Sequence, residues 1–279
     1  MTARVLIVAG SDSGGGAGIQ ADIKTVTALG GYAMTAVTAL TAQNTQGVFG
    51  VLGVAPDFIQ QQMRVVLEDI GADAIKTGML HNAAAIAAVC EVLEALDPAP
   101  PLVVDPVMVA QSGDSLLEAD AAATIARRLA PLATVLTPNV PEASTLLGRE
   151  IADAAAMVAA ATDLLDLGPR AVLLKGGHLA SGDRASGDRG GATVTDVLAT
   201  RDGHESFVSP RIETTSDHGT GCTLASALAT GLAQGLALVP AVARARAYLR
   251  EALRSAPGLG RGHGPVNHGH TVRPFDGGT

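Results

Sequence analysis

The sequence predicts an α/β protein built on a mainly parallel sheet. Short apolar runs alternate with helical patterns along most of the chain, which is typical of βαβ units. Hydrophobic residues make up 47% of the 279 residues, but aromatic residues make up only 2%. The core must therefore consist mainly of Ala, Leu and Val, which suits helices packed on a parallel sheet.

The expected elements follow one another in a regular order. Residues 4–10 form a β-branched run that ends in a glycine loop, and residues 19–29 are a predicted helix. Residues 33–40 are a predicted strand, and residues 56–70 a helix with one apolar face. Further short apolar runs, each separated from the next by a helical pattern, lie at residues 73–78, 102–106, 134–139 and 171–177. After Cys222, leucines at every fourth position predict another helix.

Composition excludes several classes of function. The net charge is −8 and no basic run is present, which argues against nonspecific binding of nucleic acid. Few aromatic residues are available to stack on the bases of single-stranded nucleic acid. The sequence has no apolar stretch of membrane-spanning length and no signal-peptide core, so we expect a soluble, cytoplasmic protein without a membrane partner. Cys90 lies in a helical pattern and is a predicted core residue; a chain with only two cysteines suits a reducing compartment.

Two segments have unusual composition. Residues 180–191 contain the tetrapeptide SGDR twice and are predicted to form a mobile surface loop, either a lid or an inert duplication. Near the C-terminus, His263, His268 and His270 resemble a metal-binding tract, but no second ligand cluster accompanies them.

Polar side chains follow several predicted strands. Asp105, Asn139 and Lys175 stand at strand ends, as does the glycine loop that begins at Gly10, and ligands collect at the carboxyl ends of parallel strands. Asp105, Asn139 and Glu142 offer the oxygen ligands that Mg²⁺ prefers, although Asn139 could also cap a helix. Lys175 could contact a phosphate or simply extend to solvent.

A second glycine-rich turn precedes the last helix. Gly219, Thr220 and Gly221 would place backbone N–H groups at a helix N-terminus, where an anion can bind. In that field the pKa of Cys222 is predicted to fall, unless the residue is only a small side chain tolerated there. The loop over residues 10–22 lacks both G-x-G-x-x-G and a P-loop motif. Phosphate is therefore expected at the Gly219 turn, and a second substrate at the Gly10 loop.

Six motifs together resemble the hydroxymethylpyrimidine/phosphomethylpyrimidine kinase family of thiamine biosynthesis: TALTAQNTQGV, DPVMVAQSGD, TPNVPEA, LLKGGHL, HGTGCT and GPVNH. The resemblance implies a single ribokinase-like kinase domain over residues 1–279, a three-layer α/β/α fold without a P-loop. It also implies phosphorylation of 4-amino-5-hydroxymethyl-2-methylpyrimidine by ATP with Mg²⁺, then of the monophosphate to the diphosphate, by a homodimer.

The resemblance also implies a role for individual residues. Gln43 would hydrogen-bond the aminopyrimidine, and Asp22, Met79 and Gly10 would line the same pocket. Lys175 and Asn139 would bind ATP, and Asp105 and Glu142 the metal. The catalytic residues would be Gly219, Thr220, Gly221 and Cys222, which together match the anion hole of the family. Cys222 would also be the thiolate base, at the position where related sugar kinases have aspartate.

Some positions depart from the family pattern, and two other functions stay open. Gly14 stands where serine is usual, Asp217 where threonine is common, and the SGDR duplication adjoins LLKGGHL. One alternative is a pyridoxal or pyridoxine kinase. The other is a non-catalytic pyrimidine-binding regulator, which would have no use for Cys222 as a base.

Overall fold

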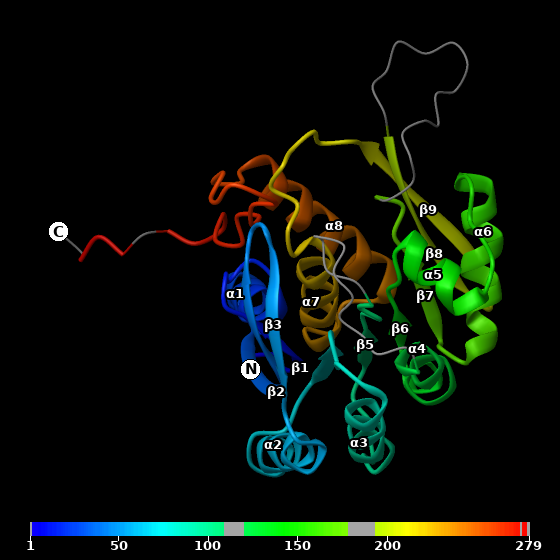
Figure 1. Ribbon diagram of the computed structural model, residues 1–279. Coiled ribbons are helices and arrows are strands. Elements are labelled where there is room, and N and C mark those ends of the chain that lie inside the picture. Colours follow the sequence, from blue (N-terminus) through cyan, green and yellow to red (C-terminus); the bar gives the residue numbers. More distant parts are fainter. Residues whose placement is uncertain (1, 109–119, 178–192, 274, 278–279) are drawn as a thin grey trace.

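The apolar runs assemble into one nine-stranded sheet. The computed structural model describes residues 2–108, 120–177, 193–273 and 275–277, and the predicted loop over residues 180–191 lies outside them. The strand order is β3-β2-β1-β4-β5-β6-β7-β8-β9 (Figure 1). The strands are β1 (Arg4–Asp12), β2 (Tyr32–Asn44), β3 (Gly47–Gly53), β4 (Ala74–Thr77), β5 (Leu102–Val104), β6 (Val135–Leu136), β7 (Ala171–Leu174), β8 (Thr193–Thr200) and β9 (Gly203–Pro210).

Strand directions confirm the predicted parallel sheet and add antiparallel edges. All neighbouring pairs from β2 through β1, β4, β5 and β6 to β7 are parallel. The outer pairs β2–β3, β7–β8 and β8–β9 are antiparallel. The sequence did not predict β3, β8 or β9, because β3 and β9 are largely exposed and lack the continuous apolar run that marks a strand buried on both faces.

Helices cover both faces of the sheet and give three layers (Figure 1). On β1, Val5 and Ile7 pack toward α1, α7 and α8, whereas Leu6 and Val8 pack into the cluster that contains the apolar sides of α2 to α6. The fold class is therefore confirmed. The helices are α1 (Gly18–Ala28), α2 (Pro56–Asp69), α3 (Ala83–Glu94), α4 (Ala121–Thr124), α5 (Val140–Leu147), α6 (Ala154–Asp163), α7 (Thr220–Ala233) and α8 (Leu238–Arg254), with short turns η1 (Ile125–Leu129), η2 (Ala130–Leu132) and η3 (Leu164–Leu167).

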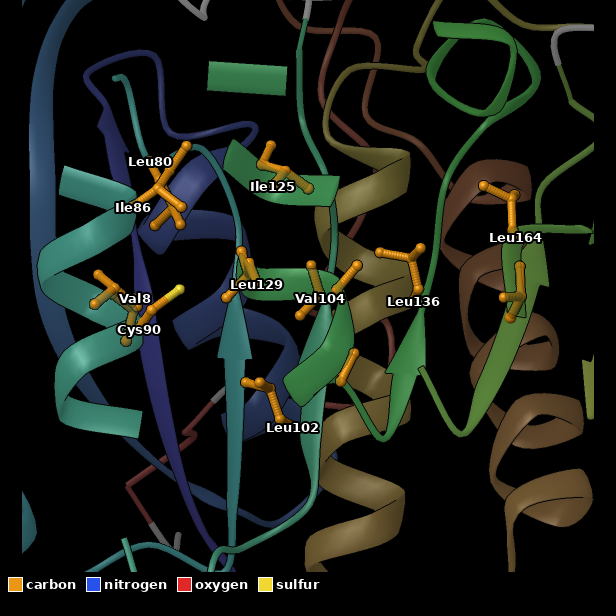
Figure 2. Packing of buried hydrophobic residues seen from close by; sticks show 14 of the residues in the cluster. Val8, Leu80, Ile86, Cys90, Leu102, Val104, Ile125, Leu129, Leu136 and Leu164 are labelled. Atoms are coloured by element: carbon orange, nitrogen blue, oxygen red, sulfur yellow. The ribbon is translucent and has the colours of Figure 1, made fainter. Parts of the chain in front are cut away.

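Aliphatic side chains from strands and helices interlock on one face of the sheet, as Figure 2 shows for Val8, Ile86, Val104 and Leu136. Cys90 belongs to this cluster and is fully buried, which confirms its predicted place in the core. Burial raises the pKa of Cys90 to about 11, so this thiol is unreactive at neutral pH.

The parallel topology places six carboxyl ends of strands at one edge. The chain leaves β1, β2, β4, β5, β6 and β7 on that side, and α7 begins there at Thr220. Within the described parts of the chain, no helix combines the length and the apolar character needed to cross a membrane. The edge that holds the strand ends is where the polar residues converge.

Candidate active site

A cavity of about 520 Å³ opens at this edge of the sheet. It extends from the glycine loop after β1, past the ends of β5, β6 and β7, to β8, β9 and α8. Eleven of the twelve predicted site residues line it: Gly10, Gln43, Met79, Asp105, Asn139, Glu142, Lys175, Gly219, Thr220, Gly221 and Cys222.

Asp22 is the exception, because it does not line the cavity as predicted. It is fully buried and accepts bonds from Lys76 Nζ at 2.9 Å on each carboxylate oxygen and from Ser226 Oγ at 2.6 Å. Lys76 is also fully buried. Burial would lower the pKa of Lys76, but Asp22 foremost raises it, so the lysine is charged. Asp22 lies behind the cavity because a buried lysine needs a paired anion.

Lys175 and Asp105 form a second ion pair, and this one faces the cavity. Lys175 Nζ lies 2.7 Å from Asp105 Oδ1, and the Lys175 side chain is 12% exposed. A Cβ at Gly221 would lie 3.3 Å from Lys175 Nζ, so the backbone of the glycine turn comes up against the pair. Burial alone would lower the pKa of Lys175, but Asp105 and Glu142 raise it. A charged lysine at this place can bind a phosphate.

Asn139 and Glu142 form a capping box at the start of α5. Glu142 N donates to Asn139 Oδ1 at 2.9 Å, and Asn139 N donates to Glu142 Oε2 at 2.7 Å. Burial raises the pKa of Glu142 to about 7; Lys175 opposes this effect and Asp105 adds to it. Two neighbouring carboxylates suit a divalent cation, and Mg²⁺ is commonly held by one or two carboxylates together with phosphates and water. The residues present therefore fit the predicted metal.

The glycine turn before α7 is held tightly from two sides. Gly219 has φ +81°, and a Cβ there would lie 1.9 Å from Gly16 O, so only glycine fits. On the other side, Thr223 Oγ1 donates to Gly219 O at 2.7 Å and lies 3.0 Å from His268 Nε2. Burial lowers the pKa of His268 to about 4, so this histidine is neutral. The turn is thereby packed between the glycine loop and the C-terminal segment.

The pKa of Cys222 differs from the prediction. The residue lines the cavity at the start of α7 as expected, but burial raises its pKa to about 12. Lys76 lowers this pKa, whereas Asp22 and Asp105 raise it. The expectation of a lowered pKa was wrong because burial disfavours the thiolate, and Asp22 and Asp105 add to this effect.

Asp12 and His218 are site residues that sequence reasoning missed. Asp12 is buried, and its carboxylate accepts bonds from the backbone N–H groups of Gly14, Gly16 and Ala17 at 2.7, 2.9 and 2.8 Å. His218 Nε2 lies 2.9 Å from Asp12 Oδ2. The signal was an acidic residue inside a glycine loop and a histidine directly before the glycine turn.

The histidines near the C-terminus have three separate partners. His263 Nδ1 lies 2.8 Å from Asp217 Oδ1, His270 Nε2 lies 3.2 Å from Tyr248 O, and His268 contacts Thr223. Over the described ranges, no group of three His, Cys, Asp or Glu residues could hold a metal by itself. The histidines hold the end of the chain against α7, α8 and the turn before α7.

The far end of the cavity is walled by β8, β9 and α8. Arg246 Nε pairs with Asp196 Oδ2 at 2.7 Å, and its guanidinium carbon lies 5.4 Å from the centre of the Phe207 ring. The apolar lining residues here are Val194, Pro210, Ile212, Leu249 and Leu253. Apolar walls beside a few polar groups are typical of a small-molecule site, and no motif in the sequence pointed to this end.

Comparison of sequences finds one family model and several relatives. The model for phosphomethylpyrimidine kinase matches residues 12–267. The hydroxymethylpyrimidine/phosphomethylpyrimidine kinase of Mycobacterium leprae is 47% identical over 95% of this chain and 93% of its own. The thiamine biosynthesis bifunctional protein ThiED of Geobacter sulfurreducens is 52% identical, and the present chain spans 52% of its length.

Solved structures with the same fold include two kinds of kinase. The phosphomethylpyrimidine kinase of Clostridium difficile 630 is 39% identical, with a TM-score of 0.77 over 90% of this chain and 100% of that chain. The pyridoxal kinase of Staphylococcus aureus with AMP-PCP is 34% identical, with a TM-score of 0.85 over 96% of this chain and 94% of that chain. Likeness of fold therefore does not separate a pyrimidine acceptor from pyridoxal.

Proposed function

Because the chain belongs to the phosphomethylpyrimidine kinase family, we propose that it transfers phosphate from ATP to 4-amino-5-hydroxymethyl-2-methylpyrimidine and then to the resulting monophosphate, in thiamine biosynthesis. The whole chain acts as one kinase domain. One observation carries the proposal beyond the family match: a single cavity joins a small acceptor end, a cluster of charged residues and an apolar end.

The charged cluster is the place of phosphoryl transfer. Lys175 and Asn139 contact the nucleotide's phosphates, and the Gly219, Thr220 and Gly221 backbone stabilises charge on the transferring group. Asp105 and Glu142 would hold Mg²⁺, which supplies charge neutralisation to the phosphates when it is bound. The adenine lies between Ile212 and the α8 leucines at the apolar end, beside Arg246 and Asp196.

The acceptor end binds the pyrimidine. Gln43 hydrogen-bonds the aminopyrimidine edge, and Met79 packs on the ring where Gly10 leaves space; a Cβ at Gly10 would lie 2.5 Å from Met79 Cε. Cys222 accepts the proton of the hydroxymethyl group. With a thiol pKa of about 12, the thiolate is scarce at neutral pH, so kcat/KM is expected to rise with pH up to about pH 10 without a plateau.

The test is a steady-state comparison of three phosphoryl acceptors: hydroxymethylpyrimidine, its monophosphate and pyridoxal. We expect turnover of both pyrimidines, with a higher kcat/KM than for pyridoxal. Cys222→Ala should lower kcat ~10²–10⁴-fold while nucleotide and pyrimidine still bind. Near-normal turnover of Cys222→Ala would remove the thiol from the mechanism, and binding without any transfer by the wild type would favour a regulator.

Pyridoxal is the second candidate acceptor, favoured by the TM-score of 0.85 to a pyridoxal kinase. Gln43 argues for the pyrimidine, since a carboxamide matches an amine beside a ring nitrogen. A higher kcat/KM for pyridoxal than for either pyrimidine would reverse the assignment.

The chain is also proposed to form a homodimer and to be located in the cytoplasm. Strand β3 is the last strand at one edge of the sheet. Its residues Phe49, Val51 and Leu52 are apolar and exposed, as is Leu40 on β2. An apolar sheet edge of this kind suits pairing with a second copy. Leu52→Lys should convert a dimer into monomers in light scattering, and a wild type that is monomeric would contradict the dimer. Both cysteines are free thiols, as is usual in the cytoplasm.

A further inference from the structure

Thr41, Gln43 and His218 meet at the acceptor end of the cavity. As placed in the structure, Gln43 Oε1 lies 3.2 Å from Thr41 Oγ1 and Gln43 Nε2 lies 3.3 Å from His218 Nε2. The oxygen and nitrogen ends of a carboxamide have nearly the same shape, so the hydrogens of their neighbours assign them.

The first assignment starts from Asp12. Its carboxylate accepts two backbone N–H groups besides the contact of 2.9 Å with His218 Nε2 on the same oxygen. Burial alone would raise the pKa of Asp12, but the bonds from His218 and the backbone lower it, so Asp12 is ionised. An ionised carboxylate only accepts hydrogen bonds, so His218 Nε2 must carry a hydrogen. This single hydrogen points mainly to Asp12 Oδ2, and only an acceptor can take the longer second branch of the bond, at 3.3 Å. The Gln43 oxygen is such an acceptor, whereas its NH₂ group only donates and cannot bond to a protonated Nε2.

The second assignment starts from Ser11 and uses different atoms. Thr41 Oγ1 lies 2.9 Å from the carbonyl oxygen of Ser11. A carbonyl only accepts, and a hydroxyl has a single hydrogen, so the Thr41 hydrogen points to Ser11. Toward Gln43 the threonine can then act only as an acceptor. The NH₂ end of Gln43 must therefore face Thr41, in agreement with the first assignment.

We propose that His218 and Thr41 are positioning residues that fix the Gln43 carboxamide, with oxygen toward His218 and nitrogen toward Thr41, and so select an acceptor ring with an amino donor beside a ring-nitrogen acceptor. A fixed amide offers its remaining N–H and lone pair in one order only, and an aminopyrimidine edge must match that order. A pyridoxine-type hydroxyl can donate or accept and is less sensitive to it. The choice of ring rests on the proposed function; the orientation of the amide does not.

Neutron diffraction of the deuterated protein tests the orientation directly. Deuterium on His218 Nε2 and an ND₂ group directed at Thr41 Oγ1 are expected. An ND₂ group directed at His218, or a bare Nε2 facing Asp12, would overturn the proposal whatever the substrate is.

The selection is tested by calorimetric binding of hydroxymethylpyrimidine and of pyridoxine to Thr41→Val, with Thr41→Ser as the matched control that keeps the acceptor. Thr41→Val should weaken pyrimidine binding about tenfold and change pyridoxine binding less than about twofold, while Thr41→Ser stays near the wild type. Equal losses for both rings, or no loss for the pyrimidine, would overturn the selection. A wild type that binds but does not phosphorylate the pyrimidine would instead refute the proposed function.

Discussion

Two lysine–aspartate pairs act on Cys222, and they differ in their access to the cavity. Lys76 and Asp22 are both 0% exposed, whereas the Lys175 side chain is 12% exposed and lines the cavity with Asp105. The buried pair, Lys76 and Asp22, is out of reach of any ligand, and Lys76 Nζ bonds both carboxylate oxygens of Asp22 at 2.9 Å. The open pair can release its lysine to a phosphate. The same chemical pair therefore serves stability in one place and binding in the other, and access decides which.

Removing the open lysine should give the largest effect on the reaction. Lys175→Met is expected to lower kcat/KM about 10²–10³-fold, the range found when a donor to developing charge is lost. The melting temperature should fall less than after removal of Lys76, because Asp105 lines the cavity, where water can replace the lysine. Steady-state kinetics and calorimetry on the same preparation check both expectations. Unchanged kinetics would mean that the open pair is structural as well.

Removing the buried lysine, Lys76, should instead act mainly on stability. Lys76→Met leaves Asp22 buried without its partner and should lower the free energy of unfolding by about 3–5 kcal/mol. The matched control is the double variant Lys76→Met with Asp22→Leu, which removes both charges and should recover most of the loss. Denaturant unfolding measures the three proteins. A double variant as unstable as the single one would show that packing, and not charge, explains the loss.

Glu142 offers a further test, because it lies beside the cavity-facing pair of Lys175 and Asp105. Its pKa of about 7 exceeds its ordinary value of 4.5, so the folded state binds more protons than the unfolded state between these values. Stability should therefore fall as pH rises from about 4.5 to 7. In Glu142→Gln, which keeps an oxygen for the capping box, this decline should disappear. Melting temperatures of the metal-free protein across this pH range check it, and an equal decline in both proteins would refute the assignment to Glu142.

The smallest expected effect concerns the support of the glycine turn. Thr223→Val removes the hydroxyl that bonds Gly219 O at 2.7 Å, and it should lower kcat about fivefold, since a polarised carbonyl strengthens the adjacent N–H donor. Thr230→Val is the matched control, because Thr230 makes the same kind of bond, to Ser226 O at 2.7 Å, farther along α7. Equal kcat values for the two variants would show that the turn does not depend on Thr223.

The sequence predicted the site residues that stand at strand ends, and it missed the ion pairs between residues that are distant along the chain. Asp105 and Lys175 were found because parallel strands bring their carboxyl ends together. Asp22 was misplaced because its partner Lys76 is 54 residues away, and spacing along a chain does not say which lysine meets which carboxylate. The pKa of Cys222 was misjudged because its burial, which raises the pKa most, and the carboxylates from α1 and the end of β5 are set by the fold and not by the adjacent sequence.

The apolar end of the cavity was missed for another reason. Strand β9 is largely exposed, and its sequence lacks the apolar run that identified the inner strands. The cavity wall at Ile212 and α8 comes from side chains that only the antiparallel edge brings together. Local pattern therefore predicted the parallel sheet and the charged cluster, and the family resemblance implied the three layers, but neither predicted the part of the site built by that edge.

The contact between His218 and Pro265 has a consequence for synthesis on the ribosome. The glycine loop after β1 is made early, but the turn at Gly219 is held by residues that are translated well after it: Gly264 O accepts from His218 N at 3.0 Å, and His268 contacts Thr223. A nascent chain stalled before residue 264 has all nine described strands, the last of which ends at Pro210, but lacks this support. Binding of nucleotide should therefore begin only after residues 264–268 leave the exit tunnel.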